Sequence, residues 1–328
     1  MADDLILRVE NLVKHFPVHS RSLFRRQTSV VHAVDGVSFD LSRGETLGLV
    51  GESGCGKSTT GRTIMQLYRP TSGSVYLDEV DIVTLSRGEL RASRRKMQMI
   101  FQDPYASLNP RMTVGEIVSD PLRVYRQGKS RKEIDEEVRS LLALVKLDPS
   151  YTNRYPHEFS GGQRQRIGVA RALALRPQLV VCDEPISSLD VSIQAQVVNL
   201  LVDLQKQLNL TYLFIAHDLS MVRHVCDRVA VMYLGIIVEL AASRELYTSP
   251  LHPYTQALLR SIPSIRSIAR TELPTIAGSI PHPYNRPAGC PFYPRCPDFK
   301  PGVCDKAEPG LTVLGDGQAV SCFLYERT

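Results

Sequence analysis

Residues 51–59, GESGCGKST, have the spacing of a phosphate-binding loop, GxxxxGK followed by Ser or Thr. Glycines at Gly51, Gly54 and Gly56 let successive backbone N–H groups converge on phosphate oxygens without collisions between Cβ atoms. Lys57 would reach the β- and γ-phosphates and the Ser58 hydroxyl would ligate Mg²⁺. The remaining loop positions expected to hold nucleotide are Ser53 and Thr59. The pattern predicts a nucleoside triphosphate site but does not separate ATP from GTP.

The elements on either side support this interpretation. Residues 46–50 form an apolar run typical of a buried strand, and a helical pattern extends from Lys57 to about Leu67. The start of a helix presents its positive dipole end to an anion. A chance glycine turn is the alternative, and the strand–loop–helix context disfavours it.

A second group of candidate site residues lies at the end of another apolar run, LVVCDE at residues 179–184. Asp183 is placed to hold the Mg²⁺ shell, and Glu184 to polarise the attacking water as a general base. Taken alone, the two carboxylates would be a solvated strand end. With the phosphate-binding loop upstream, they predict hydrolysis of the nucleotide.

A second anion-binding helix start is predicted at SGGQRQR, residues 160–166, where Ser160, Gly161, Gly162 and Gln163 precede an apolar helical run. One nucleotide does not need two such helix ends from one chain. The second end is therefore expected to serve a nucleotide held by a partner chain.

The intervening sequence indicates how these residues are positioned. The first 50 residues alternate as strands do, with a turn at residues 42–44, which predicts a small antiparallel β layer. Residues 103–155 are helical in pattern, with Ile134, Val138, Leu141, Leu142 and Val145 on one face. Strands and helices alternate from 179 to about 240, with a hairpin about residues 234–235. This order predicts an α/β fold with a mainly parallel sheet.

Composition narrows the class further. The 39 basic and 34 acidic residues leave a formal charge of +5, spread along the chain, which is too mild to indicate nucleic-acid binding. No apolar run approaches the roughly 20 residues that span a bilayer. A soluble, cytoplasmic protein is expected.

The motifs together resemble the ATP-binding subunits of ABC transporters, in which SGGQ is the signature motif. The resemblance covers residues 5–250 and implies ATP as the nucleotide. It implies that Gln102 is the glutamine that contacts Mg²⁺ or water and senses the membrane subunit. Ser188–Asp190 would be the D-loop that crosses a dimer interface, and His217 the switch histidine that contacts the γ-phosphate. Phe16 stands where an aromatic residue stacks on adenine.

The same resemblance implies the architecture. An ABC ATP-binding domain would occupy residues 1–250, with a helical subdomain at about 103–165. Residues 251–328, which we call the C-terminal extension, are proline-rich and irregular. Two ATP-binding domains would sandwich two ATP molecules, each between one chain's loop and the other chain's signature.

Segments such as FQDPYASLNPRMTVGEIV and SPLHPYTQALL are similar to the dipeptide and oligopeptide branch of ABC importers. That resemblance implies a peripheral subunit on the cytoplasmic face of the membrane. Its partners would be a second ATPase, in a heterodimer, two transmembrane permease subunits and an extracytoplasmic peptide-binding protein. Importers for nickel or glutathione carry similar ATPases, and non-transport ABC ATPases share the motifs. Both alternatives stay open.

Four cysteines fall in the C-terminal extension, with gaps of five, seven and seventeen residues: Cys290, Cys296, Cys304 and Cys322. Four thiolates suit either tetrahedral zinc or an iron–sulfur cluster. Zinc sites more often contain two tight CxxC pairs, which are absent here. Some ATPases of peptide importers with such a cysteine set carry a 4Fe–4S cluster, so the cluster is preferred to Zn²⁺. The metal is expected to stabilise a tail that builds little core.

Overall fold

The structure is a computed structural model. It describes residues 4–19, 28–125, 130–262, 286–315 and 317–326, together with residues 276, 278, 279, 281 and 284. The chain divides into two compact units. The first comprises Met1–Ile6, Leu41–Glu45 and Thr84–Ile215, and the second comprises Leu7–Asp40, Thr46–Val83 and Ala216–Thr328. Each is described by itself.

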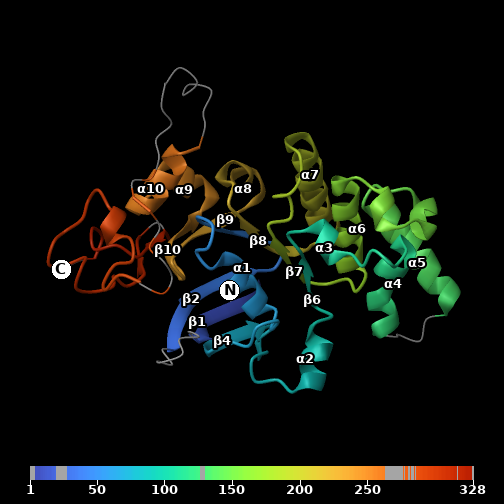
Figure 1. Cartoon of the computed structure of the whole chain (residues 1–328), viewed down its shortest axis with the longest axis horizontal. Coiled ribbons are helices and arrows are strands. Elements are labelled where there is room, and N and C mark those ends of the chain that lie inside the picture. The colour runs from blue at the N-terminus through green and yellow to red at the C-terminus, as the bar shows by residue number, and fades with distance from the viewer. Residues whose placement is uncertain are drawn as a thin grey trace. The chain divides into compact units, whose positions relative to one another are not determined.

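The first unit contains three parallel strands and a set of helices (Figure 1). The strands are β6 (Met97–Ile100), β7 (Leu179–Asp183) and β8 (Thr211–Ala216), with β7 between the other two. All five residues of β7 are buried, as a strand covered on both faces requires. The helices are α2 (Arg87–Ser93), α3 (Pro104–Ser107), α4 (Val114–Val124), α5 (Arg131–Leu144), α6 (Gly161–Leu173) and α7 (Val191–Leu208), with 3₁₀ turns η2 (Pro149–Asn153) and η3 (Pro156–Glu158).

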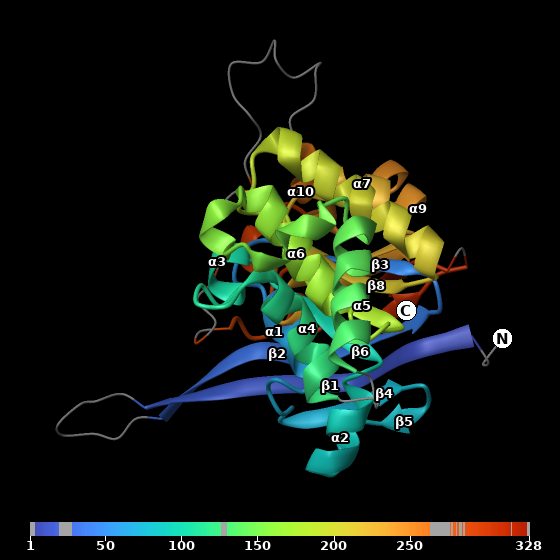
Figure 2. The same ribbon diagram turned by 90° about the vertical axis from the view of Figure 1, so that its right-hand side faces the viewer.

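Helices α4, α5 and α6 pack side by side in both views (Figures 1 and 2). Each starts at a capping box, in which the side chain of Thr113, Ser130 or Ser160 accepts from the backbone three residues later. The helical face predicted for residues 134–145 is confirmed, because its five apolar residues are buried. Between β6 and β7 the described chain is helical, as expected. The limits of the subdomain remain a prediction.

The second unit contains a four-stranded sheet in the order β2-β1-β4-β5, and the antiparallel layer is confirmed. Its strands are β1 (Leu5–His19), β2 (Thr28–Ser42), β4 (Ser72–Leu77) and β5 (Val80–Asp81). Two residues of β1 and two of β2 belong to the first unit. A register shift between Glu10 and Val13 marks a bulge in β1 opposite β4.

The same unit contains a second, mixed set of strands. In this set β3 (Thr46–Val50) pairs in parallel with β9 (Arg228–Tyr233), and β10 (Ile236–Ala242) pairs antiparallel with β9. The predicted hairpin about residues 234–235 is confirmed. The helices of this unit are α1 (Lys57–Ile64), α8 (Leu219–Val225), α9 (Ser243–Thr248) and α10 (Pro253–Arg260). Helix α1 ends three residues before the predicted end at Leu67.

The C-terminal extension packs onto this second unit. Strands β11 (Thr312–Val313) and β12 (Ala319–Val320) pair with each other, and β12 also pairs antiparallel with β10. Three aromatic rings lie in mutual contact, with centroids 4.6–5.3 Å apart: Tyr233, Tyr254 and Phe292. All three are fully buried, so the extension shares an apolar core with β9. In the described part of the chain, no helix combines the length and apolar character needed to cross a membrane.

Candidate functional site

The phosphate-binding loop lies between β3 and α1, as predicted. Gly56 caps α1 with φ of 107°, a conformation that favours glycine. A Cβ atom there would stand 2.1 Å from the carbonyl oxygen of Ala33 on β2, and one at Gly51 would stand 2.2 Å from that of Met232. Neither carbonyl belongs to a flexible side chain, so these glycines are required by the packing of the loop.

Lys57 holds the loop together through two of its backbone carbonyl groups. Its Nζ donates to the carbonyl oxygens of Gly51 at 2.8 Å and Glu52 at 2.9 Å, and its side chain is buried. A buried ammonium group needs such partners. The same group is the one that the sequence assigns to the β- and γ-phosphates, and that assignment remains a prediction.

The catalytic carboxylates predicted from the sequence lie in the first unit. Asp183, at the end of β7, is fully buried. Glu184 follows with φ of 45°, a left-handed conformation that is uncommon for a residue with a Cβ atom, and its amide donates to the carbonyl of Ile215 at 3.0 Å. Strained backbone of this kind concentrates at functional sites.

Gln102 and Glu184, which lie 82 residues apart, meet in the structure. The Nε2 atom of Gln102 donates to the carboxylate of Glu184 at 2.8 Å. Both are predicted site residues, yet their contact was not anticipated. It couples the segment after β6 to the proposed general base.

The signature residues start α6 as predicted. Ser160 Oγ accepts from the Gln163 amide at 3.4 Å, and Gln163 Oε1 accepts from the Ser160 amide at 3.0 Å. A Cβ atom at Gly162 would stand 2.3 Å from Cγ2 of Ile193 on α7, and one at Gly161 would stand 3.2 Å from Cδ2 of Leu189. The signature therefore packs closely against the predicted D-loop and the start of α7 in its own chain.

The predicted D-loop is held by a residue that was not among the predicted site residues. Asp190 stands at the N-cap position of α7 without a side-chain capping bond. Gln194 Nε2 donates to the carbonyl oxygens of Leu189 at 2.9 Å and Ile186 at 3.2 Å. A glutamine in the first turn of a helix carries no local signal of that role.

Two further predicted site residues, Phe16 and His217, lie in the second unit. Phe16, on β1, is half-buried and meets Tyr68 edge-on, with centroids 5.5 Å apart. Lys14 Nζ lies 4.9 Å from the centroid of the Phe16 ring. His217 follows β8 directly and is exposed. Their assignments to adenine and to the γ-phosphate remain predictions.

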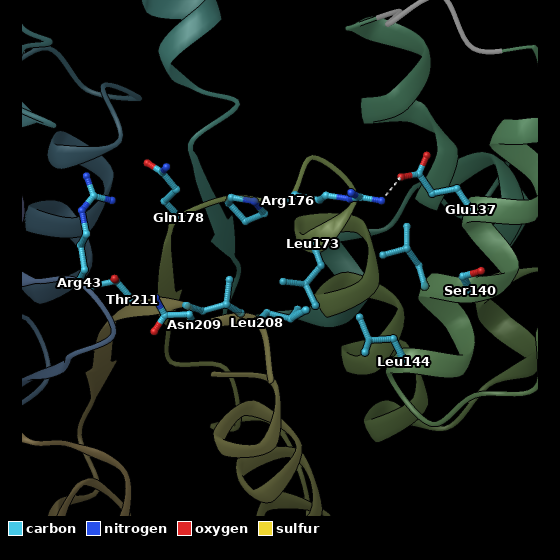
Figure 3. Close-up of a pocket in the computed structure, with 13 residues that line it drawn as sticks. Arg43, Glu137, Ser140, Leu144, Leu173, Arg176, Gln178, Leu208, Asn209 and Thr211 are labelled. Carbon is cyan, nitrogen blue, oxygen red and sulfur yellow. Dashed lines mark ion pairs between the residues drawn. The ribbon is translucent and has the colours of Figure 1, made fainter. Parts of the chain in front are cut away.

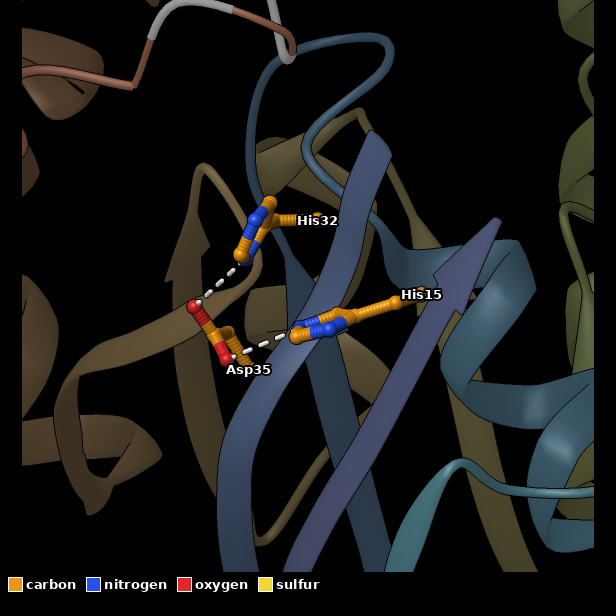
Figure 4. Close-up of side chains that lie close together, drawn as sticks. All are labelled: His15, His32 and Asp35. Atoms are coloured by element: carbon orange, nitrogen blue, oxygen red, sulfur yellow. Dashed lines mark hydrogen bonds and ion pairs between the residues drawn. The ribbon is translucent and has the colours of Figure 1, made fainter. Parts of the chain in front are cut away.

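Next to Phe16 lies a charged cluster on β1 and β2 (Figure 4). The imidazoles of His15 and His32 point at different oxygens of Asp35, at 3.1 and 3.3 Å. Arg286 of the C-terminal extension also donates to Asp35 and reaches Glu308 at 2.9 Å. The three ligand atoms are close enough for a metal ion, but the arginine already compensates the carboxylate.

A second arginine of the extension reaches the phosphate-binding loop. Arg295 donates to both carboxylate oxygens of Glu52, at 2.8 and 3.1 Å, and to the Tyr233 hydroxyl at 3.4 Å. Burial alone would lower the pKa of Arg295, but the bonds to Glu52 and Tyr233 outweigh it and raise that pKa. The amide of Glu52 also donates to the Tyr254 hydroxyl at 2.9 Å.

The four late cysteines are free thiols that line one cavity together with His252 and Phe292. Burial raises the pKa of Cys290 and of Cys296 to about 11, and it also raises the pKa of Cys322. No three of these sulfurs all lie within 4.8 Å of one another. Among the described residues, that criterion is met only by His15, His32 and Asp35.

One described pocket lies elsewhere in the first unit, away from every predicted site residue (Figure 3). It encloses about 640 Å³. Its wall is apolar, with Leu144, Leu173 and Leu208 facing it, and an Arg176–Glu137 ion pair of 3.7 Å at one side.

Comparison with known proteins fits this geometry. Residues 34–187 match the ABC transporter family, and residues 238–304 match the oligopeptide/dipeptide transporter C-terminal region. A solved structure, a post-hydrolysis dimer of the ATP-binding cassette MJ0796 bound to ADP and Pi, aligns with a TM-score of 0.64 at 29% identity, over 73% of this chain and 99% of that one. CbiO1 from Clostridium perfringens, part of the ABC transporter complex CbiONQ, aligns with a TM-score of 0.63 at 28% identity, over 75% and 92% of the two chains.

The fold and these motifs define an ABC-type phosphate-loop ATPase. The oligopeptide transport ATP-binding protein AppF of Bacillus subtilis is 54% identical over 98% of both chains. YkfD of the same organism, a putative oligopeptide transport ATP-binding protein, is 52% identical over 98% of this chain and 96% of its own. The chain belongs to the ABC transporter family, within its oligopeptide transport ATP-binding proteins.

Proposed function

We propose that this chain hydrolyses ATP to drive the uptake of oligopeptides across the cell membrane, acting from the cytoplasmic face. The observation that carries the proposal is the full-length likeness to AppF, which includes the C-terminal extension. The contact between Gln102 and Glu184 supports it, because it joins a proposed sensor of the membrane subunit to the proposed base. The partners would be two transmembrane permease subunits, an extracytoplasmic peptide-binding protein and a second ATPase in a heterodimer.

In the proposed reaction, the loop at residues 51–59 would hold the phosphates. Ser58, Asp183 and Gln102 would hold Mg²⁺, which would neutralise charge that develops on the phosphate oxygens. Glu184 accepts a proton from water while the water oxygen attacks the γ-phosphorus and the bond to the β–γ bridging oxygen breaks. His217 would contact the γ-phosphate. The signature of the partner ATPase would close over the same nucleotide, which is why turnover requires two subunits.

The first test is affinity purification of the chain from detergent-solubilised membranes of its host, followed by mass spectrometry. Co-purification of two multi-spanning subunits and a second ATPase is expected. In the purified assembly, Glu184→Gln should bind ATP yet lose at least about 100-fold in turnover. Appreciable hydrolysis by that variant would remove Glu184 from its role. Partners that are ribosomal or nucleic-acid-bound, without membrane subunits, would favour a non-transport ATPase.

Cargo is tested separately, by peptide-stimulated ATP hydrolysis of the assembly in membrane vesicles with its binding protein. Di- and oligopeptides are expected to stimulate turnover. Stimulation by nickel or glutathione alone would assign the chain to one of the related importers instead.

We also propose a 4Fe–4S cluster at Cys290, Cys296, Cys304 and Cys322. All four thiols face one cavity, which fits a four-thiolate site. Tetrahedral zinc with bonds of about 2.3 Å would draw the sulfurs to roughly 3.8 Å from one another. No three of the described sulfurs lie within 4.8 Å of one another, so they do not form a preformed tetrahedral zinc site. The role of the iron–sulfur group would be to stabilise the extension.

Anaerobic purification followed by iron, sulfide and zinc analysis tests this cluster. Equal amounts of iron and acid-labile sulfide are expected, and Cys296→Ser should remove them while ATP binding by the full-length chain persists. Cys226→Ser, at a buried cysteine outside the cavity, is the control. Stoichiometric zinc without sulfide would replace the cluster by a zinc site.

A further inference from the structure

The C-terminal extension makes hydrogen bonds to the phosphate-binding loop at Glu52. The guanidinium of Arg295 meets its carboxylate in a two-bonded fork, at 2.8 and 3.1 Å. The Arg295 side chain is only 4% exposed, whereas that of Glu52 is 22% exposed. Fork pairs of this kind fix direction as well as distance.

Glu52 also lies between the extension and Lys57. Its amide donates to the Tyr254 hydroxyl at 2.9 Å, and its carbonyl oxygen accepts from Lys57 Nζ at 2.9 Å. Side chain, amide and carbonyl of this one residue are therefore all engaged. A change at Arg295 reaches the lysine of the loop through a single residue.

The charge of Glu52 explains why its ion pair with Arg295 is needed. The loop is built to attract the phosphates of a nucleotide, yet its second residue is a carboxylate. An uncompensated negative charge close to a polyanion opposes binding, most strongly where solvent is partly excluded. The buried guanidinium of Arg295 neutralises that charge and holds the carboxylate away by a fixed geometry.

We propose that Arg295 is a positioning residue for the phosphate-binding loop, through which the C-terminal extension sets the affinity of the loop for ATP. The inference rests on the proposed role of residues 51–59 in holding the phosphates. If Arg295 only anchored the C-terminal extension to the rest of the second unit, the affinity for ATP would not depend on the charge of Glu52.

The chain offers a matched control for the structural alternative. Arg286 belongs to the same extension and also pairs with a carboxylate of the second unit, Asp35, but that residue lies on β2 and not in the loop. Loss of Arg286 should loosen the extension to a similar degree without placing a free charge beside the phosphates.

The experiment is calorimetric titration of Mg-ATP into the purified full-length chain and its variants. Arg295→Met should weaken ATP binding about tenfold or more, since an unpaired carboxylate then faces the phosphates. Glu52→Gln in the Arg295→Met background should restore binding to within about threefold of the parent chain, because the charge is gone. Arg286→Met should change ATP binding less than about twofold. Thermal unfolding of each variant shows that it is folded at the assay temperature.

Two results would overturn the proposal. In one, the double variant binds ATP as weakly as Arg295→Met, so that the charge of Glu52 is not the cause. In the other, Arg286→Met weakens binding as much as Arg295→Met, so that any loosening of the extension suffices. If Arg295→Met does not fold, Arg295→Gln is compared in the same way.

Lys57→Ala tests the proposed phosphate-binding role of residues 51–59 separately from the role of Arg295. That variant should lose ATP binding in every background. Parent-like binding by Lys57→Ala would show that residues 51–59 do not hold the phosphates, and the proposed function of the loop would fail together with the role of Arg295.

Discussion

Gln102 donates a hydrogen bond of 2.8 Å to the carboxylate of Glu184. This bond holds the proposed base on the segment that follows β6. Any movement of that segment is thereby transmitted to Glu184. A membrane partner that contacts the Gln102 segment would have a direct route to the chemistry.

Gln102→Glu tests the contact by its charge. Two carboxylates at that distance repel each other, so Glu184 should be displaced from the position that it holds against Gln102. We expect ATP hydrolysis by the assembled transporter to fall about tenfold or more below that of Gln102→Met, which removes the bond without adding charge. Equal rates for the two variants would contradict the contact.

Gly162→Ala should clash with Ile193, because the added Cβ atom falls 2.3 Å from the Ile193 Cγ2 atom. Over-packing of this kind costs about 1–3 kcal/mol of stability. Thermal unfolding should show the loss, and ATP hydrolysis by the assembled transporter should fall with it. The double variant Gly162→Ala/Ile193→Ala removes the opposing methyl group and should recover part of both losses. No recovery would mean that the clash is not the cause.

Ser160→Ala separates the cap of α6 from its proposed function. The variant loses the capping box, which costs about 1 kcal/mol. Ser130→Ala loses an equivalent box at the start of α5 and should be destabilised to the same degree. Only Ser160→Ala should also lower ATP hydrolysis, measured at a temperature where both variants are folded. Equal activity in the two variants would limit Ser160 to a structural role.

His252 predicts a pH dependence of stability. Burial lowers its pKa to about 3, against 6.5 for the free side chain, so the folded chain binds fewer protons than the unfolded chain in that interval. The stabilising contribution is complete above about pH 6.5 and is lost as the pH falls toward 3. His252→Asn keeps an acceptor for the Tyr254 amide at the start of α10 but cannot titrate. Between pH 7 and 5, thermal unfolding should shift less in His252→Asn than in the parent chain.

Much of the fold follows from local patterns. Strand β3 has the predicted bounds, because an apolar run is visible within a short window. The loop and the start of α6 were located in the same way, from glycine spacing. Few residue types bind phosphate or cap helices, so these motifs can be recognised from the sequence alone.

Contacts between distant residues could not be read in that way. Glu52 and Arg295 lie 243 residues apart, and neither belongs to a repeating pattern. Gln194, which holds the D-loop, resembles any polar residue on a helix surface. The pairing of β12 with β10 was also missed, because two-residue strands have no detectable period.

That last pairing has a consequence for synthesis on the ribosome. Strand β10 is translated some 80 residues before β12, and Glu239 and Leu240 of β10 face Val320 and Ala319 of the late strand. Until that strand emerges, the edge of β10 presents unpaired N–H and C=O groups of the kind that recruit other chains. A nascent chain arrested before residue 319 would thus expose an unpaired edge strand that can pair with other chains. Chaperone occupancy during translation should persist until the last strand is released.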